Sequence, residues 1–206
     1  MKQVAVVGGN HGAGKTTLCS VIQSMTGCLT AKQRQLVVEI GGTEGLSGWD
    51  QIGPYHDDFI ERAAWLVLMR FLASKSELLL IDGHFSIRRT KALRKSAGLV
   101  NGKFVPDLDP RLLGILNRYT DLKLIYLETS PEVAIERFSN RETALLDFDN
   151  TQLGMAEKNV ADKECFDRLI ETFSVKPIHW IVLCNEKPID ETVQKAMSFI
   201  SPLSPW

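Results

Sequence analysis

The sequence lacks a long hydrophobic run, a strong excess of one charge, and any metal-type cysteine spacing. No apolar stretch is long enough to span a bilayer, so we expect no membrane-crossing segment. The 206 residues carry a formal net charge of -1, which gives no bulk electrostatic case for nucleic-acid binding. The four cysteines, Cys19, Cys28, Cys165 and Cys184, are scattered. We therefore expect reduced, mostly buried thiols in a cytoplasmic protein rather than a zinc site.

The remaining composition is that of a globular chain. Hydrophobic residues make up 44% of the sequence and charged residues 24%, and no repeat or low-complexity tract interrupts it. We expect residues 1–206 to form a single domain. A strand pattern begins almost at the first residue, so we do not expect a signal peptide.

The chain is organised around a glycine-rich stretch that begins at Gly9. It reads Gly9, Asn10, His11, Gly12, Ala13, Gly14, Lys15, Thr16 and matches the phosphate-loop pattern G-x-x-x-x-G-K-[ST]. An apolar strand pattern precedes it and a helical pattern follows. The glycines allow successive N–H groups to cradle a phosphate, and the following helix directs its positive end at the same anion. We expect ATP to contact this stretch and Thr17.

Two residues are expected to hold Mg²⁺ beside that loop. The run Leu78–Asp82 is a continuous apolar strand that ends in a carboxylate, the form of a Walker B strand. We assign Asp82 and the Thr16 hydroxyl to the metal, and Lys15 to the β- and γ-phosphates.

Hydrophobic periodicity predicts alternating strands and helices along the whole chain. Expected strands are residues 2–7, 35–40, 78–82, 122–128 and 178–183, and expected helices are 15–25, 59–74, 110–119, 131–138, 151–173 and 190–200. This alternation predicts an α/β, three-layer P-loop NTPase fold: a five-stranded parallel sheet with helices on both faces. Helix 59–74 is apolar nearly all round, so we expect it to be well buried, with Arg70 in a surface salt bridge.

Two polar segments are expected to frame the site. Residues 41–54 form a glycine-rich loop after the strand 35–40, and it is either an acceptor-side loop or a mobile surface connection. Trp49 favours the functional interpretation, because a tryptophan is costly to expose. Glu39 is expected at the carboxyl end of the strand 35–40, facing the cleft. Residues 139–150 suit a mobile lid.

Several motifs resemble the nucleoside-monophosphate-kinase branch of phosphate-loop proteins, and most of all archaeal-type adenylate kinases. They are Ile81-Asp82-Gly83-His84-Phe85-Ser86-Ile87-Arg88, then Lys103 to Leu108, then Tyr126 to Glu132 followed by Arg137 and Arg141, and finally Val182 to Glu186. The resemblance implies a nucleoside-kinase-like fold in which Arg88, Arg137 and Arg141 contact phosphates and the loop at Asn185 lies against the adenine base.

The sequence departs from that family in its lid and its acceptor side. Residues 139–149 supply only Arg141, and residues 41–54 have no counterpart. For Arg137 and Arg141 the competing interpretation is salt bridging on a helix surface. His11 and His84 are expected to be structural or solvent-facing, with no role in proton transfer.

Three functions remain open at this point. The first is transfer of the γ-phosphate of ATP, with Mg²⁺, to a nucleoside monophosphate, with Glu39 binding a base, a sugar or an arginine. The second is transfer to a nucleoside or other small hydroxyl, with Glu39 as the base. The third is a nucleotide-switched binding protein in which residues 41–54 and the basic run 88–95 face a partner. The sequence names neither the acceptor nor the oligomeric state.

Overall fold

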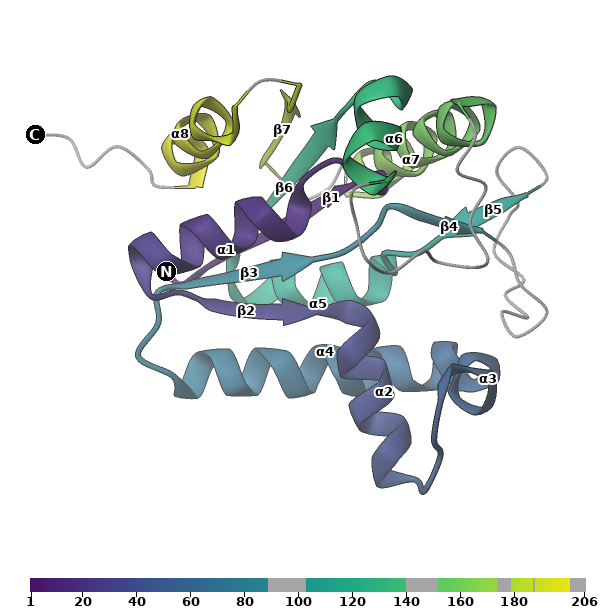
Figure 1. Cartoon of the computed structure of the whole chain (residues 1–206). Helices are drawn as coiled ribbons and strands as arrows, with labels where there is room; N and C mark the ends of the chain where they lie inside the picture. The colour runs from purple at the N-terminus through teal and green to yellow at the C-terminus, as the bar shows by residue number, and fades with distance from the viewer. Residues whose placement is uncertain (89–102, 140–151, 174–178, 187, 201–206) are drawn as a thin grey trace, which may run out of the picture.

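The computed structural model describes residues 1–88, 103–139, 152–173, 179–186 and 188–200. Five parallel strands form one sheet in the order β2-β3-β1-β6-β7. The strands are β1 (Gln3–Gly9), β2 (Leu29–Lys32), β3 (Leu78–Asp82), β6 (Asp121–Glu128) and β7 (His179–Cys184). A separate antiparallel pair joins β4 (Ser86–Arg88) to β5 (Phe104–Pro106). Figure 1 shows the sheet at the centre of the molecule.

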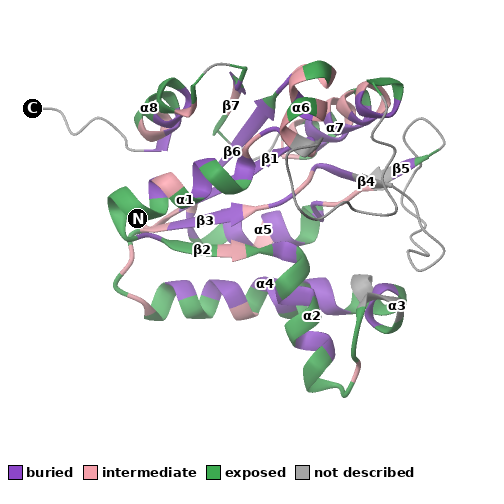
Figure 2. Cartoon of the chain, viewed as in Figure 1, coloured by how far each residue is buried: buried purple, intermediate pink, exposed green. Residues whose placement is uncertain are grey.

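Helices cover both faces of the sheet, because alternate residues of each buried strand point to opposite sides. On one side, Val4 and Val6 of β1 pack in a core with α2 (Gln33–Thr43), α4 (His56–Ala73), α5 (Pro110–Tyr119) and α7 (Gln152–Thr172). On the other side, Ala5 and Val7 pack with α1 (Lys15–Thr26) and α8 (Ile189–Ile200). The central strands are accordingly buried along nearly their whole length (Figure 2). The expected three-layer α/β fold is confirmed.

The second strand was placed wrongly by the sequence pattern. Residues 35–40 lie inside α2, and the real second strand is the preceding segment, Leu29–Lys32. Leu36, Val37 and Ile40 are buried at a helical spacing, whereas Val38 is exposed. A short apolar run does not distinguish a buried strand from a helix. The true strand lies at the edge of the sheet and is largely exposed, so it lacks an apolar run.

The expected loop 41–54 is mostly helical. α2 continues to Thr43, and after a short turn come α3 (Trp49–Ile52) and η1 (Gly53–Tyr55). A Cβ at Gly41 would lie 2.7 Å from Cγ1 of Ile52, so this glycine allows α3 to pack closely on α2. Trp49 belongs to α3, and its side chain lies outside the described part of the structure.

α4 is less buried than its composition predicts. Trp65, Met69 and Leu72 are exposed on its outer side, so the expectation of a well-buried helix was wrong. Arg70 does form the expected surface salt bridge, with Glu39 of α2.

The remaining helices agree with their predicted ranges to within a few residues, and α6 (Pro131–Ser139) begins at the expected proline. All four cysteines are free, and only Cys184 is exposed. Among the described residues, no helix has the length and apolar character needed to cross a membrane.

Candidate functional site

The candidate functional site lies at the carboxyl edge of the sheet, where the strand ends meet. β1 runs into the glycine-rich loop, and α1 starts at Lys15 directly after it. Val7 of β1 is aligned with Asp82 of β3, and Asp82 is aligned with Lys32 at the end of β2. The strand order therefore places the loop, a carboxylate and a lysine along one edge, as expected for a cleft in a doubly wound sheet.

The glycines of the loop adopt the backbone conformations that the motif requires. Gly12 and Gly14 have φ angles of 78° and 87°, in the left-handed region that other residues avoid. A side chain at Gly12 would also clash with α6, because a Cβ there would lie 2.5 Å from the carbonyl oxygen of Ala134. The loop is therefore fixed by tight packing against α6 as well as by its own turns.

Lys15 is held inside the curve of the loop. Its Nζ donates to the carbonyl oxygens of Gly9, at 2.9 Å, and Asn10, at 2.8 Å, and the residue is only 7% exposed. These contacts keep a buried ammonium group on the inner side of the loop, where a bound phosphate would meet it.

Asp82 and Thr16 meet as the Walker B expectation requires. The Thr16 hydroxyl donates to Oδ2 of Asp82 at 2.8 Å, although the two residues are 66 positions apart. A hydroxyl and a carboxylate are hard oxygen donors of the kind Mg²⁺ prefers. Among the described residues, no group of three or more His, Cys, Asp or Glu side chains is placed to hold a metal ion. The residues thus fit a Mg²⁺ that completes its coordination with phosphate and water rather than with protein groups.

His84 packs against His11, a residue of the same loop. The rings of His11 and His84 have centroids 4.5 Å apart, and His84 Nδ1 lies 3.1 Å from the Gly9 carbonyl oxygen. Because a carbonyl oxygen only accepts, Nδ1 carries the proton in this hydrogen bond. Burial, followed by the charge of Lys15, holds the pKa of His84 well below its ordinary value of 6.5. His84 is therefore a neutral donor that helps to fix the loop, consistent with a structural role.

Asn10 anchors the loop to α7. It is 1% exposed, and its Nδ2 donates to Asn159 Oδ1 at 2.6 Å and to the Met155 carbonyl oxygen at 3.3 Å. Its Oδ1 accepts from the N–H of His11. The side chain of Asn10 is thus engaged by α7, and its contribution to nucleotide binding would come from the backbone.

Asn185 and Arg137 support the other end of the loop. Asn185 Nδ2 donates to the Ala13 carbonyl oxygen at 2.7 Å, and its Oδ1 accepts from Thr192. Arg137 Nη1 donates to the Asn185 carbonyl oxygen at 2.7 Å. Asn185 is buried, so this side chain buttresses the loop, while contact of its segment with adenine stays a prediction.

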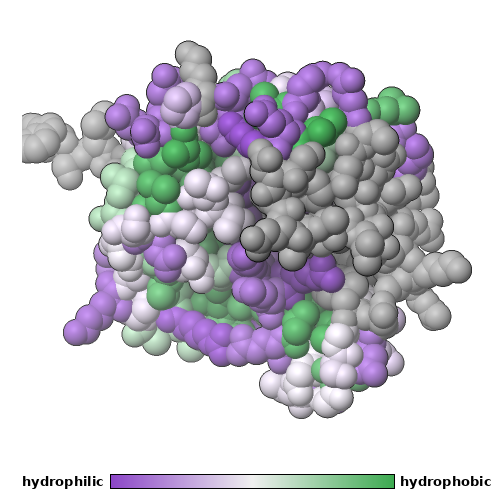
Figure 3. Space-filling view, in the orientation of Figure 1, coloured by the Kyte–Doolittle hydropathy of each residue, from purple (hydrophilic) through white to green (hydrophobic). Residues whose placement is uncertain are grey.

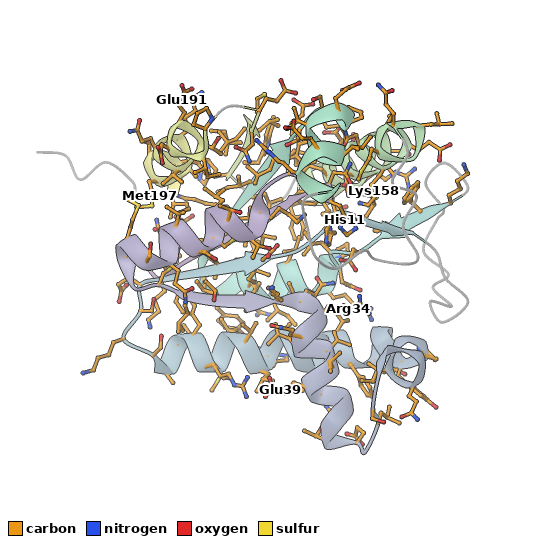
Figure 4. All side chains as sticks on the ribbon, in the orientation of Figure 1. His11, Arg34, Glu39, Lys158, Glu191 and Met197 are labelled. Atoms are coloured by element: carbon orange, nitrogen blue, oxygen red, sulfur yellow. The ribbon has the colours of Figure 1, made fainter. Side chains whose placement is uncertain are left out.

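The other expected site residues are placed less centrally. Thr17 is exposed at the start of α1. Glu39 belongs to α2, and its side chain reaches toward α4, away from His11 at the loop (Figure 4), because its expected strand is a helix. Its carboxylate is paired with Arg70, which lowers the pKa of Glu39.

The remaining expected phosphate contacts fall partly outside the described structure. Arg88 belongs to β4, but its side chain is not described. Arg141 and residues 140–150 of the expected lid lie outside the described residues.

A buried ion pair beneath β4 was not predicted. Lys158 Nζ donates to Asp162 Oδ1 at 2.7 Å and to the carbonyl oxygen of Ser86 at 2.8 Å, and both charged residues are almost fully buried. The N–H and hydroxyl of Ser86 both donate to the same Asp162 oxygen. An i,i+4 Lys–Asp pair normally indicates a solvated helix face, so no sequence signal distinguished this one.

Comparisons with known proteins agree with this fold. The family model AAA_18, described as "AAA domain", matches residues 6–157. No curated protein sequence matches the chain.

Among solved structures, a sugar kinase from Janibacter sp. HTCC2649 is similar with a TM-score of 0.54 and 19% identity, covering 98% of this chain and 96% of that one. Shikimate kinase from Acinetobacter baumannii, in complex with shikimate, has a TM-score of 0.52 and 17% identity, with coverage of 97% and 93%. Deoxyadenosine kinase from M. mycoides, with bound dATP, has a TM-score of 0.52 and 17% identity, with coverage of 96% and 97%. At these identities the likeness shows the fold.

Proposed function

The chain belongs to the AAA_18 family of AAA domains, and from this premise we propose that it is an ATP-dependent phosphotransferase. The donor would be ATP with Mg²⁺, and the acceptor a nucleoside monophosphate, as in adenylate kinases. The single observation that carries the donor side is the Thr16–Asp82 hydrogen bond beside a fully formed phosphate loop. The shikimate kinase and deoxyadenosine kinase structures named above share the fold, and this analogy supports transfer over simple hydrolysis.

Each residue of the donor side has a proposed role. The loop amides and Lys15 would hold the β- and γ-phosphates, while Thr16 and Asp82 would hold Mg²⁺. Bound there, Mg²⁺ would neutralise phosphate charge. Arg137 lies at the loop and would contribute positive charge, with Arg88 and Arg141 as further proposed phosphate contacts.

The acceptor side favours an anion over a neutral hydroxyl. β2 ends at Lys32, and α2 begins with Gln33 and Arg34, with no acidic residue in its first turn. This helix start adds its positive dipole to two basic side chains at the edge where Asp82 lies. Glu39, the proposed base for a hydroxyl acceptor, is instead exposed and paired with Arg70. A monophosphate is already ionised and needs no base, so it suits this edge better.

The test is an acceptor screen with purified protein, Mg²⁺ and ATP labelled in the γ-phosphate. We expect label to move to one or more nucleoside monophosphates and not to nucleosides, sugars or shikimate. Lys32→Ala should raise the acceptor KM by ~10–100-fold with a smaller effect on kcat, as loss of a charged hydrogen bond implies. Lys195→Ala, an exposed lysine of α8 on the opposite side of the sheet, is the matched control.

Other results would select another function. Transfer only to neutral hydroxyl compounds would overturn the monophosphate acceptor while keeping the phosphotransferase. ATP binding with slow hydrolysis, and no transfer to any acceptor, would favour a nucleotide-switched binding protein.

A further inference from the structure

The start of α2 holds a buried amide with an unpaired oxygen. Gln33 is the first residue of α2 and is only 2% exposed. Its Nε2 donates to the carbonyl oxygen of Asp107 at 2.6 Å. Because a carbonyl oxygen only accepts, the amide nitrogen must face Asp107, and Oε1 faces away from it. Oε1 is buried and has no hydrogen-bond partner among the described residues.

An unpaired buried acceptor is costly, so a glutamine at this position needs an explanation. Burial removes the oxygen from solvent, and no described protein donor compensates for this loss. Glutamine is also mostly found exposed, and ordering its long side chain costs conformational entropy. A methionine of similar shape would fill the same space without an unpaired oxygen. Since Oε1 adds no interaction to the fold, a ligand is the partner that would explain it.

Gln33 differs from the other two unpaired buried atoms in the described part of the chain. They are Asp162 Oδ2 and Thr129 Oγ1. The Asp162 carboxylate is already compensated through Oδ1, which accepts from Lys158 and Ser86. Thr129 follows β6, which lies on the opposite side of β1 from β3 and β2. Of the three, only Gln33 lies at the proposed acceptor side.

The amide lies at the edge of the sheet where the proposed transfer would take place. Lys32, the residue before Gln33, is aligned with Asp82 of β3 and makes no side-chain capping hydrogen bond at the start of α2. Lys32 and Arg34 are both exposed. Figure 4 shows Arg34 and His11 of the phosphate loop on the same side of the molecule, and Figure 3 shows hydrophilic residues at the surface where β2 passes into α2. A phosphate held at this helix start would bring the rest of its molecule close to the buried amide.

We propose that Gln33 is a specificity residue of the proposed acceptor site, and this inference rests on the proposed phosphotransfer. Lys32 and the start of α2 would hold the acceptor phosphate, while Gln33 Oε1 accepts a hydrogen bond from the uncharged part of the acceptor. The group that it binds is an N–H or an O–H, because an amide oxygen only accepts. A nucleoside monophosphate has donors of both kinds, on its base and on its sugar. Phosphates without such a donor would be poor acceptors.

The first test uses the unaltered protein, ATP and Mg²⁺, with the monophosphate that accepts label best. Each N–H or O–H group of its base and sugar is removed in turn, by means of deamino, N-methyl and deoxy analogues. We expect one analogue to lose ~10–100-fold in kcat/KM, because it would leave Oε1 without a donor. A loss with a base analogue identifies an N–H donor, and a loss with a sugar analogue identifies an O–H donor. Equal kcat/KM for all analogues would overturn the proposal, and this comparison depends on no substitution in the protein.

The second test assigns that donor to Gln33. Gln33→Met keeps a similar shape without the amide oxygen, so it should raise the KM of the parent monophosphate ~10–100-fold and reduce discrimination against the analogue to less than ~3-fold. It should leave the KM of ATP unchanged and Tm within about 3 °C of wild type, because removal of the unpaired oxygen offsets the lost hydrogen bond to Asp107. Gln35→Met, at an exposed glutamine two positions along α2, is the matched control and should change none of these values.

The outcomes separate this inference from the proposed function. Gln33→Met with an unchanged acceptor KM, or with the wild-type discrimination against the analogue, would overturn the role of Gln33 while keeping the phosphotransferase. Equal losses of acceptor and ATP binding, together with a much lower Tm, would show that Gln33 is structural and would also overturn it. No transfer by the unaltered protein to any acceptor would overturn both the inference and the proposed function.

Discussion

Replacing Lys158 should test how strongly the buried ion pair of α7 holds the fold. Its Nζ has three hydrogen-bond acceptors, namely Asp162 Oδ1 and both the carbonyl and hydroxyl oxygens of Ser86, at 2.7–3.0 Å. In Lys158→Met the carboxylate of Asp162, 0% exposed, would lose its only charged partner among the described residues. Removing one member of a buried pair costs about 3–5 kcal/mol, because the other charge is left uncompensated.

The same helix provides a matched control. Lys163 and Asp167 form a second i,i+4 pair on α7, but their side chains are 44% and 51% exposed. Lys163→Met should therefore cost no more than about 0.5 kcal/mol. For a chain of this length, 1 kcal/mol corresponds to roughly 2–4 °C in Tm, so Lys158→Met should lower Tm by roughly 6–20 °C and Lys163→Met by less than about 2 °C.

A double variant separates charge from packing. Lys158→Met with Asp162→Asn removes both charges, while the amide oxygen of the substituted side chain can still accept from the Ser86 N–H and hydroxyl. Its cost should therefore be smaller than that of Lys158→Met alone, with a coupling energy of at least about 2 kcal/mol. Denaturant unfolding of the wild type, the two single variants and the double variant measures this. Equal costs for Lys158→Met and Lys163→Met, or strictly additive single variants, would refute the reasoning.

The remaining predictions concern the phosphate loop and its surroundings. Lys15→Ala should abolish phosphotransfer while leaving Tm near the wild-type value, as assayed by label transfer and thermal unfolding. Asp82→Asn should lower turnover and raise the Mg²⁺ concentration needed for half-maximal activity, and a Mg²⁺ titration that superimposes on wild type would contradict this. Glu39→Gln should change kcat and acceptor KM little, because Glu39 is exposed and paired with Arg70. His84 is neutral when folded and gains a proton on unfolding, so stability should fall below a pH of about 6.5 more steeply in wild type than in His84→Gln.

The sequence was sufficient to predict the fold because most of its signals are local. The phosphate loop needs glycines at fixed positions. β1 and β3 each contain a continuous apolar run, and β6 is apolar from Leu122 to Leu127 except at Lys123. The second strand was missed because Leu29–Lys32 lies at the sheet edge and is largely exposed. Burial therefore does not require a run of apolar residues there. The misassigned residues 35–40 are apolar on one helical face, and over six residues the two periodicities look alike.

The partners of the residues that support the site could not be predicted, because each hydrogen bond spans a large separation in the sequence. Asn10 bonds to Asn159, 149 positions later, and Asn185 bonds to Ala13 across 172 positions. Asparagine within a phosphate loop or a helix carries no sign of its partner. Position within the fold, rather than residue type, decides that Lys158 and Asp162 are buried while Lys163 and Asp167 are exposed.

α7 connects the phosphate loop to β4. Its Asn159 binds Asn10 of the phosphate loop, and one turn along, Asp162 binds the N–H of Ser86 at the start of β4. The loop is the proposed donor site, and β4 carries Arg88, a proposed phosphate contact. Since both attachments are to one rigid helix, a displacement of α7 would move the loop and β4 together. The position of Arg88 relative to the donor phosphates would then depend on hydrogen bonds that never touch a substrate.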